Sequence, residues 1–236
     1  MDDLCHYDTI VQQLRSDYKK AIVRQDISAI YSVDDDNISG VFLSKPSEDY
    51  FNVSPRIMVV GQEPRGWRDK ACKVKNNLEI DEVDLQESMN KTLEFARSGG
   101  KTSKFFQFYR KVAKEVHLAN KDAIIWSNQF CVSSNKKSPV KTSKDKFAII
   151  KDLSNDLLKA QINNLRPDVV IFTTGPSRDK YIKECFPELE TIEVIVPRRL
   201  WHFKVGSVHC FRITHPRYLR GNKMWGQVIE HVKEVC

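Results

Sequence analysis

Residues 56–67 read RIMVVGQEPRGW, an apolar run that ends abruptly in a polar loop containing glycine and proline. Consecutive apolar residues such as Ile57–Val60, bounded by turn residues, are typical of a short buried strand. Three further runs of this kind follow along the chain, at 123–126, 169–172 and 208–213. These four runs are the predicted strands of the protein.

The stretches between the predicted strands have helical patterns. Apolar residues recur at helical spacing within 105–116 and 147–162, and again near the two ends of the chain within 10–22 and 225–235, the last after a possible cap at Asn222. Strands that alternate with helices favour a mostly parallel sheet covered on both faces. The sequence therefore predicts an α/β fold, a three-layer α/β/α sandwich around a mostly parallel four-stranded sheet.

The length of 236 residues suits one α/β domain. We expect a single domain over residues 1–236, with residues 1–55 as an N-terminal helix and loop extension packed on it. Within that extension, residues 32–55 are polar and contain two prolines, which predicts a loop with a short strand at Val41–Leu43.

Composition limits the class of protein. Lysine and arginine outnumber aspartate and glutamate by 38 to 31, and the net charge of +7 fits a partner with phosphates. The six cysteines are scattered without a CxxC pair, which favours reduced thiols inside a cell over a metal site or a disulfide framework. No apolar run approaches the roughly 18 residues of a membrane span, and the chain starts without a signal-peptide pattern. We expect a cytoplasmic protein that does not enter a membrane.

Polar residues follow three of the predicted strands. Gln62 and Glu63 follow the first, Asn128 follows the second, and His215 follows the last. The carboxyl ends of parallel strands meet at one edge of a sheet, so a carboxylate, an amide and an imidazole are expected to converge there. Cleavage of a glycosidic bond requires such a set of groups.

These loops resemble the motifs of the uracil-DNA glycosylase superfamily. VVGQEPRGW is similar to its first motif, a strand followed by Gly-Gln-Asp-Pro, with Glu63 at the aspartate position. ITHPRYLR is similar to its second, a strand followed by His-Pro-Ser-Pro-Leu. Between them, IIWSNQFCV resembles the strand ending in the asparagine that reads the base, and DVVIFTTG a further strand ending in glycine. The four matches occur in the family's order.

The resemblance implies a catalytic role for two residues. Glu63 would stabilise the cation-like sugar and position or activate water, and His215 would donate a hydrogen bond to the pyrimidine O2 as negative charge builds there. The backbone N–H of Gln62 would add a second donor. Neither a metal nor a redox cofactor is required, and no obligate protein partner is implied.

The resemblance also implies contacts with DNA. Asn128 would read the base edge, and its amide can pair with uracil or cytosine. Leu219 stands where the family places an apolar wedge that enters the base stack, and Arg217 replaces a serine and would touch phosphate. A lysine-rich stretch that includes Lys136, Lys137 and Lys141 is expected to be a flexible loop that contacts the phosphate backbone; the alternative is an ordinary solvated surface.

Departures from the family concern the substrate. Arg65 and Gly66 stand where the uracil-specific branch has a tyrosine that excludes larger bases, so room for a C5 substituent is expected. A hydroxymethylated or glucosylated cytosine of phage DNA is then a candidate substrate. Trp67 is a candidate for stacking on the flipped base, with Phe105 or Phe106 as alternatives and a core role open for each of them.

Three functions remain in competition. The first is a monofunctional glycosylase acting on a modified pyrimidine in anti-phage defence, and the second is uracil excision in base-excision repair. The third is a DNA-binding protein that keeps the fold without catalysis. A nucleotide hydrolase is excluded, because TTGPS at 173–177 lacks the lysine of a phosphate-binding loop.

Overall fold

The computed structural model of the chain describes residues 2–31, 38–65, 67, 80–100, 102–116, 120, 122–218 and 223–235. They fall into two compact units, each built from separated segments. The first unit comprises Met1–Lys45, Gln62–Glu94 and Asn128–Leu165, and the second comprises Pro46–Gly61, Phe95–Ser127 and Arg166–Cys236. The single domain expected from the sequence stays a prediction.

Apart from Asn128 at the end of β2, the second unit contains a six-stranded sheet of order β2-β1-β3-β6-β5-β4. The strands are β1 (Ile57–Gly61), β2 (Ile124–Asn128), β3 (Val169–Phe172), β4 (Glu190–Val196), β5 (Leu200–Val205) and β6 (Val208–Ile213). β3 pairs in parallel with β1 on one side and with β6 on the other, so that Phe172 lies opposite Val60 and Arg212. The α/β class and the largely parallel sheet are confirmed, but the sheet has six strands rather than four. The three-layer arrangement stays a prediction.

The two additional strands form a hairpin, β4 and β5, that pairs antiparallel to β6. The sequence pattern predicted only helix between 172 and 208, and of that stretch η5 (Pro176–Arg178) and α5 (Asp179–Cys185) are helical. β4 was missed because it is an outer strand. Ile192 and Val194 are about half exposed, so the strand lacks the continuous apolar run of a buried one.

Two longer helices of the second unit were predicted from their apolar faces. α3 (Lys104–Val116) buries its aromatic face, and α6 (Lys223–Glu234) packs on it through Trp225 and Phe108, whose ring centroids lie 5.6 Å apart. Asn222, the cap suggested for α6, lies outside the described residues.

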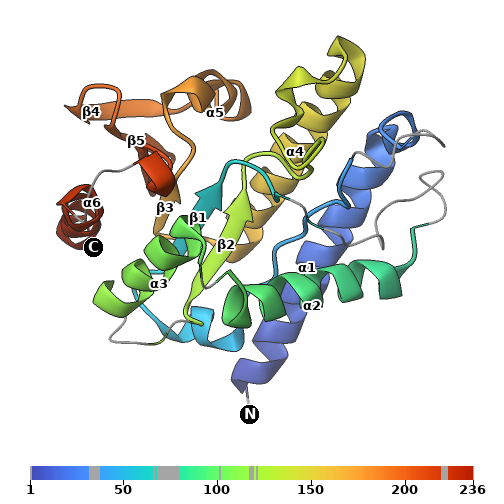
Figure 1. Ribbon diagram of the computed structural model, residues 1–236. Helices are drawn as coiled ribbons and strands as arrows, with labels where there is room; N and C mark the ends of the chain where they lie inside the picture. The colour runs from blue at the N-terminus through green and yellow to red at the C-terminus, as the bar shows by residue number, and fades with distance from the viewer. Residues whose placement is uncertain are drawn as a thin grey trace. The chain divides into compact units, whose positions relative to one another are not determined.

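The first unit contains α1 (Asp2–Arg24) and α4 (Lys144–Leu165), which lie side by side (Figure 1). The predicted apolar face of α1 is buried, including Leu14, Tyr18 and Ile22. The Tyr18 hydroxyl donates a 2.9 Å hydrogen bond to the carbonyl of Ser44, and burial raises the pKa of Tyr18 well above its ordinary value. The N-terminal helix is therefore fixed by apolar packing and by a buried hydrogen bond.

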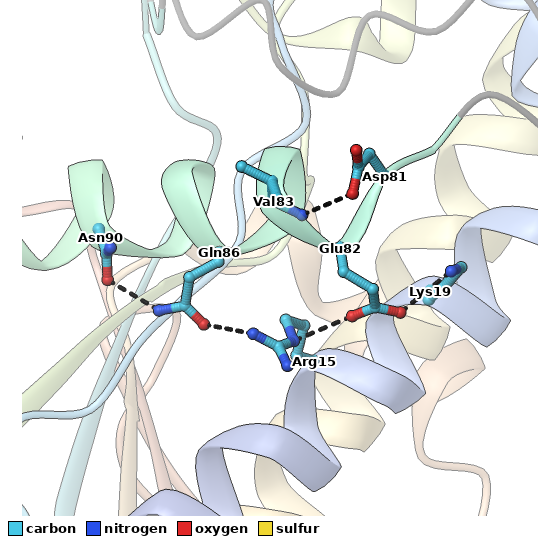
Figure 2. A network of polar contacts seen from close by, with 7 residues as sticks. All are labelled: Arg15, Lys19, Asp81, Glu82, Val83, Gln86 and Asn90. Carbon is cyan, nitrogen blue, oxygen red and sulfur yellow. Dashed lines mark hydrogen bonds and ion pairs between the residues drawn. The ribbon is translucent and has the colours of Figure 1, made fainter.

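Figure 2 shows how α2 (Glu82–Ser98) is attached to α1. Asp81 caps the helix by accepting a 2.9 Å hydrogen bond from the Val83 N–H. Arg15 of α1 donates to Gln86 at 2.8 Å and lies 3.0 Å from a Glu82 carboxylate oxygen. The start of α2 is therefore held to α1 by a small polar network.

A short strand predicted at Val41–Leu43 is not present, although the segment is buried. Its chain runs beside residues 131–134 and shares only isolated bonds with them. The N–H of Phe42 donates to Cys131 O at 2.8 Å, and the N–H of Ser39 donates to Ser133 O at 2.9 Å. The segment is extended, but these bonds do not form the regular ladder that defines a strand.

Two histidines of the sheet are packed against each other. His202 Nε2 lies 3.0 Å from His209 Nδ1, and the His202 ring stacks on Phe211 with centroids 4.4 Å apart. Burial, with a smaller contribution from His209, lowers the pKa of His202 to about 4. His202 is therefore neutral at pH 7.

None of the helices in the described part of the chain combines the length and apolarity needed to cross a membrane.

Ser154 of α4 generates a stability prediction. Its hydroxyl accepts a 3.0 Å hydrogen bond from the buried Cys131 N–H, so Ser154→Ala leaves that donor without its acceptor. We expect the free energy of unfolding, measured in urea, to fall by about 1–3 kcal/mol. Ser88→Ala is the matched control, since the Ser88 hydroxyl makes only a 3.5 Å contact with Val41 O, and we expect a loss below about 1 kcal/mol. Equal losses in the two variants would contradict this assignment.

His202 generates a pH prediction. Because its pKa is lower in the folded than in the unfolded chain, the unfolded state binds more protons between the two values. The contribution of His202 to the free energy of unfolding should be fully present above pH 6.5. It should fall progressively as the pH drops and be lost at about pH 4. Urea unfolding of the protein and of His202→Phe at pH 7 and pH 4.5 tests this. The free energy of unfolding should differ less between the two pH values in the variant than in the unaltered protein. His6→Gln, on the exposed face of α1, is the control and should leave the difference unchanged.

Candidate functional site

The loop after β1 is held by hydrogen bonds to its backbone carbonyls within the first unit. The N–H of Phe130 donates to Gln62 O at 3.0 Å, and the Ser133 hydroxyl donates to Pro64 O at 3.2 Å. Within the loop, Arg65 N–H donates to Glu63 O, also at 3.0 Å. The conformation of residues 62–65 therefore depends on the segment that follows Asn128.

Glu63 is the most enclosed charged group of this loop. Its side chain is 4% exposed, and one carboxylate oxygen lies 3.8 Å from the Arg65 Nε. The Arg65 side chain is 52% exposed, so the ion pair reaches from the surface to the buried carboxylate. A buried carboxylate beside a cation is suited to acid–base or electrostatic chemistry.

The aromatic candidates differ in their surroundings. Trp67 is partly buried and packs edge-on against Phe42, with 5.6 Å between ring centroids. Phe105 and Phe106 are buried in α3 of the second unit, where Phe106 packs on Trp126 at 4.9 Å. This packing favours a core role for the two phenylalanines. Gly66 lies outside the described residues.

Asn128 is the last residue of β2 and is 6% exposed. Its side-chain Nδ2 is buried and has no hydrogen-bond partner among the described residues. A buried amide donor without a partner is unfavourable by about 1–3 kcal/mol, which makes Asn128 a candidate for contact with a ligand.

The lysine-rich stretch begins with a tight turn, and its expected flexibility stays a prediction. Ser134 and Lys137 exchange backbone hydrogen bonds of 3.0 and 2.8 Å across a tight turn. The two central residues have positive φ, 51° at Asn135 and 57° at Lys136, the geometry of a type I′ turn. η4 (Pro139–Lys141) follows, and Lys136, Lys137 and Lys141 are all exposed.

In the second unit, the loops after β3 and β6 are bonded to each other. The N–H of Gly175 donates to Ile213 O at 2.9 Å. Gly175 has a φ of 75°, and a Cβ there would lie 3.9 Å from the backbone nitrogen of His215. Glycine is required here by the backbone angle rather than by lack of space.

His215 follows β6 and is held by its own turn. The backbone N–H of Arg217 donates a 3.2 Å hydrogen bond to His215 Nδ1, and the Tyr218 N–H donates to His215 O at 2.8 Å. Because Nδ1 accepts a hydrogen bond, the imidazole proton is on Nε2. The turn therefore favours the tautomer in which Nε2 is the donor.

Arg217 is exposed, and its guanidinium lies 5.4 Å from the centre of the Tyr218 ring. Tyr218, which sequence reasoning did not single out, is 65% exposed and lies edge-on to the His215 ring at 6.2 Å. The signal in the sequence that could have identified Tyr218 was its position directly after His-Pro-Arg. Leu219, the predicted wedge, lies outside the described residues.

Sequence reasoning also missed the ion pair near the end of β6 between the buried Arg212 and the partly buried Asp179. A charged residue inside the apolar run at 208–213 was the available signal.

The structure places Gln62, Glu63, Arg65, Trp67, Asn128 and the three lysines in the first unit, and His215 and Arg217 in the second. Within the first unit, a backbone hydrogen bond joins the segment that follows Asn128 to the loop that carries Glu63. Within the second unit, His215 and Arg217 belong to one turn. The described part of the chain has no cluster of three His, Cys, Asp or Glu side chains arranged to hold a metal ion.

Comparison with known proteins agrees with the motifs in the sequence. Residues 48–234 match the model of a family described as "UDG: Uracil DNA glycosylase superfamily". The match covers most of the chain and includes every candidate residue described above. No curated protein matches the chain. The membership predicted from the four strand-end motifs is thereby confirmed: the chain belongs to the uracil-DNA glycosylase superfamily.

Proposed function

We propose that the protein is a monofunctional DNA glycosylase that flips a pyrimidine nucleotide out of DNA, hydrolyses its N-glycosidic bond and leaves an abasic site. Family membership supports DNA glycosylase activity in general. The observation that carries the proposal is the hydrogen bond from the Arg217 N–H to His215 Nδ1, because it fixes Nε2 as a donor.

His215 acts in this proposal on the departing base. As the glycosidic bond breaks, negative charge accumulates on the pyrimidine O2, and the Nε2–H of His215 donates to it. A fixed donor that meets developing charge contributes about 3 kcal/mol in comparable sites. The backbone N–H of Gln62 is the second proposed donor to the base.

Asn128 reads the base in this proposal. Its buried Nδ2 gains a partner when the polar edge of a pyrimidine arrives, so binding removes an existing penalty. The amide pairs with a uracil or a cytosine edge after rotation of the side chain, so Asn128 alone does not select between them.

Glu63 is assigned to the sugar. Its buried carboxylate stabilises positive charge that develops on the deoxyribose and positions the attacking water. Because glutamate is one methylene longer than the family's aspartate, its carboxylate reaches about 1 Å further, enough to change the rate on uracil substantially.

The favoured substrate is a C5-modified cytosine, such as hydroxymethylcytosine or its glucosylated form in phage DNA. Support comes from Arg65, a half-exposed arginine in place of the aromatic residue that excludes C5 substituents, with Gly66 after it. Arg65 has donors for the hydroxyl groups of such a substituent. Acting on phage DNA, the enzyme would serve defence.

The contacts proposed for the DNA backbone are Arg217, Lys136, Lys137 and Lys141, all exposed. Leu219 is proposed as the wedge, and Trp67 as the residue that stacks on the flipped base.

A cytoplasmic location belongs to the same proposal. It is supported by Cys131 and Cys210, which are buried thiols outside any disulfide, and burial raises the pKa of Cys131 to about 12. Thiols of this kind are typical of proteins in reducing compartments.

One prediction of the proposed function concerns base release. DNA containing uracil, thymine mismatches, hydroxymethylcytosine or glucosyl-hydroxymethylcytosine is incubated with the protein, and released bases are identified by mass spectrometry. We expect release of a modified cytosine, and a loss of at least about 100-fold in Glu63→Gln and His215→Ala. Glu230→Gln, an exposed residue of α6, is the control and should keep full activity.

Other outcomes of this experiment identify the competing functions. Release of uracil alone would make the protein a repair-type enzyme and would contradict the role given to Arg65 and Gly66. Binding of DNA without release of any base would favour a non-catalytic DNA-binding protein.

Another prediction of the proposed function concerns the three exposed lysines of the lysine-rich stretch. Replacing Lys136, Lys137 and Lys141 together with alanine leaves up to three phosphates without a lysine partner, so the slope of log affinity against log salt should fall by about 0.9 for each phosphate that is no longer neutralised. Fluorescence anisotropy with a duplex at several salt concentrations measures the slope. Lys159→Ala, in the same unit and exposed on α4, should leave it unchanged. An unaltered slope in the triple variant would indicate an ordinary solvated surface.

A further inference from the structure

The Arg212 side chain is buried at the end of β6, three residues before His215. It is 4% exposed, and its Nη2 donates a 2.9 Å hydrogen bond to one carboxylate oxygen of Asp179. Its Nε lies 2.7 Å from the other oxygen. A buried guanidinium needs such a partner, because an uncompensated charge in this environment is strongly destabilising.

The pair joins three segments of the second unit. Arg212 belongs to β6, and Asp179 begins α5 at the end of the loop that follows β3. Arg212 Nη1 also donates to the carbonyl of Arg198, in the turn between β4 and β5, at 3.2 Å. One side chain therefore fixes β6 to a loop on each side of it.

Backbone hydrogen bonds continue this attachment toward His215. Gly175 N–H donates to Ile213 O, and Thr214 N–H donates to Arg199 O at 3.1 Å. Every residue from 212 to 214 is thus bonded to one of the two loops that the Arg212 side chain holds. His215 comes next, and its ring is set by the turn that starts there.

We propose that Arg212 and Asp179 form a positioning pair that sets the place of the turn holding the His215 imidazole by fixing the loops after β3 and β6 to each other. The pair does not touch substrate in this proposal, which rests on the catalytic role proposed for His215. Burial raises the pKa of Asp179 and Arg212 opposes that rise, which agrees with an enclosed ion pair.

The test uses the full-length protein and the isosteric variant Asp179→Asn. Loss of the charge should let the loop after β3 shift, and a displacement of about 1 Å at a reacting group lowers the rate by about 100-fold. We expect kcat for base release to fall by about that factor while KM for DNA changes less than about twofold. Asp179→Glu, which keeps the charge, should lose less.

A second readout does not depend on activity. The ¹⁵N chemical shifts of His215 report which ring nitrogen carries the proton, and Asp179→Asn should convert the single Nε2–H form into a mixture. Asp168→Asn is the matched control, since Asp168 accepts a 2.7 Å hydrogen bond from the Arg56 N–H beside the start of β3, at the opposite end of the same strand. It should change neither kcat nor the His215 shifts.

The outcomes separate the two proposals. If Asp179→Asn lowers only the melting temperature and leaves kcat and the His215 shifts unchanged, the pair is merely structural and the positioning proposal is wrong. If the unaltered protein releases no base but the His215 shifts change in Asp179→Asn, the positioning holds and the glycosylase proposal fails.

Discussion

The parallel pairing of β3 with both β1 and β6 is the constraint on which the second unit depends. It aligns the carboxyl ends of three strands, so that the chain leaves each of them at one edge of the sheet. The pairing extends beyond the strands, because Thr173 donates to Val60 O through both its N–H and its hydroxyl. The positions of Gly175 and His215 follow from this alignment.

In the first unit, the loop that carries Glu63 is held through its own backbone carbonyls. The carbonyls of Gln62 and Pro64 accept hydrogen bonds from Phe130 and Ser133, and the latter is bonded in turn to Ser39. Loops arranged in this way tolerate changes of side chain without moving.

The sequence was sufficient where a pattern is local and repeated. The four apolar runs and the helical faces are visible in any short window, and β1, β2, β3, β6, α1, α3, α4 and α6 all follow from them. β4 could not be predicted this way, since Ile192 and Val194 face solvent in an outer strand, and the burial of Arg212 depends on Asp179, 33 residues away. The His215 tautomer likewise depends on a backbone N–H that no side-chain pattern reveals. Motif order identified Glu63, Asn128 and His215 as candidates, but their environments required the structure.

The irregular pairing of β4 has a consequence for self-association. β4 is one of the two outer strands of the sheet, and an outer strand with apolar side chains is a template for strand addition between molecules. Its register with β5 shifts twice, between Thr191 and Glu193 and between Glu193 and Val196, and its last residue is followed by Pro197. Register shifts increase the twist of an edge strand, so that a flat strand of another molecule fits poorly beside it. A proline has no backbone N–H with which to bond such a strand. The hairpin can therefore carry exposed Ile192 and Val194 while resisting the edge-to-edge growth that leads to aggregates.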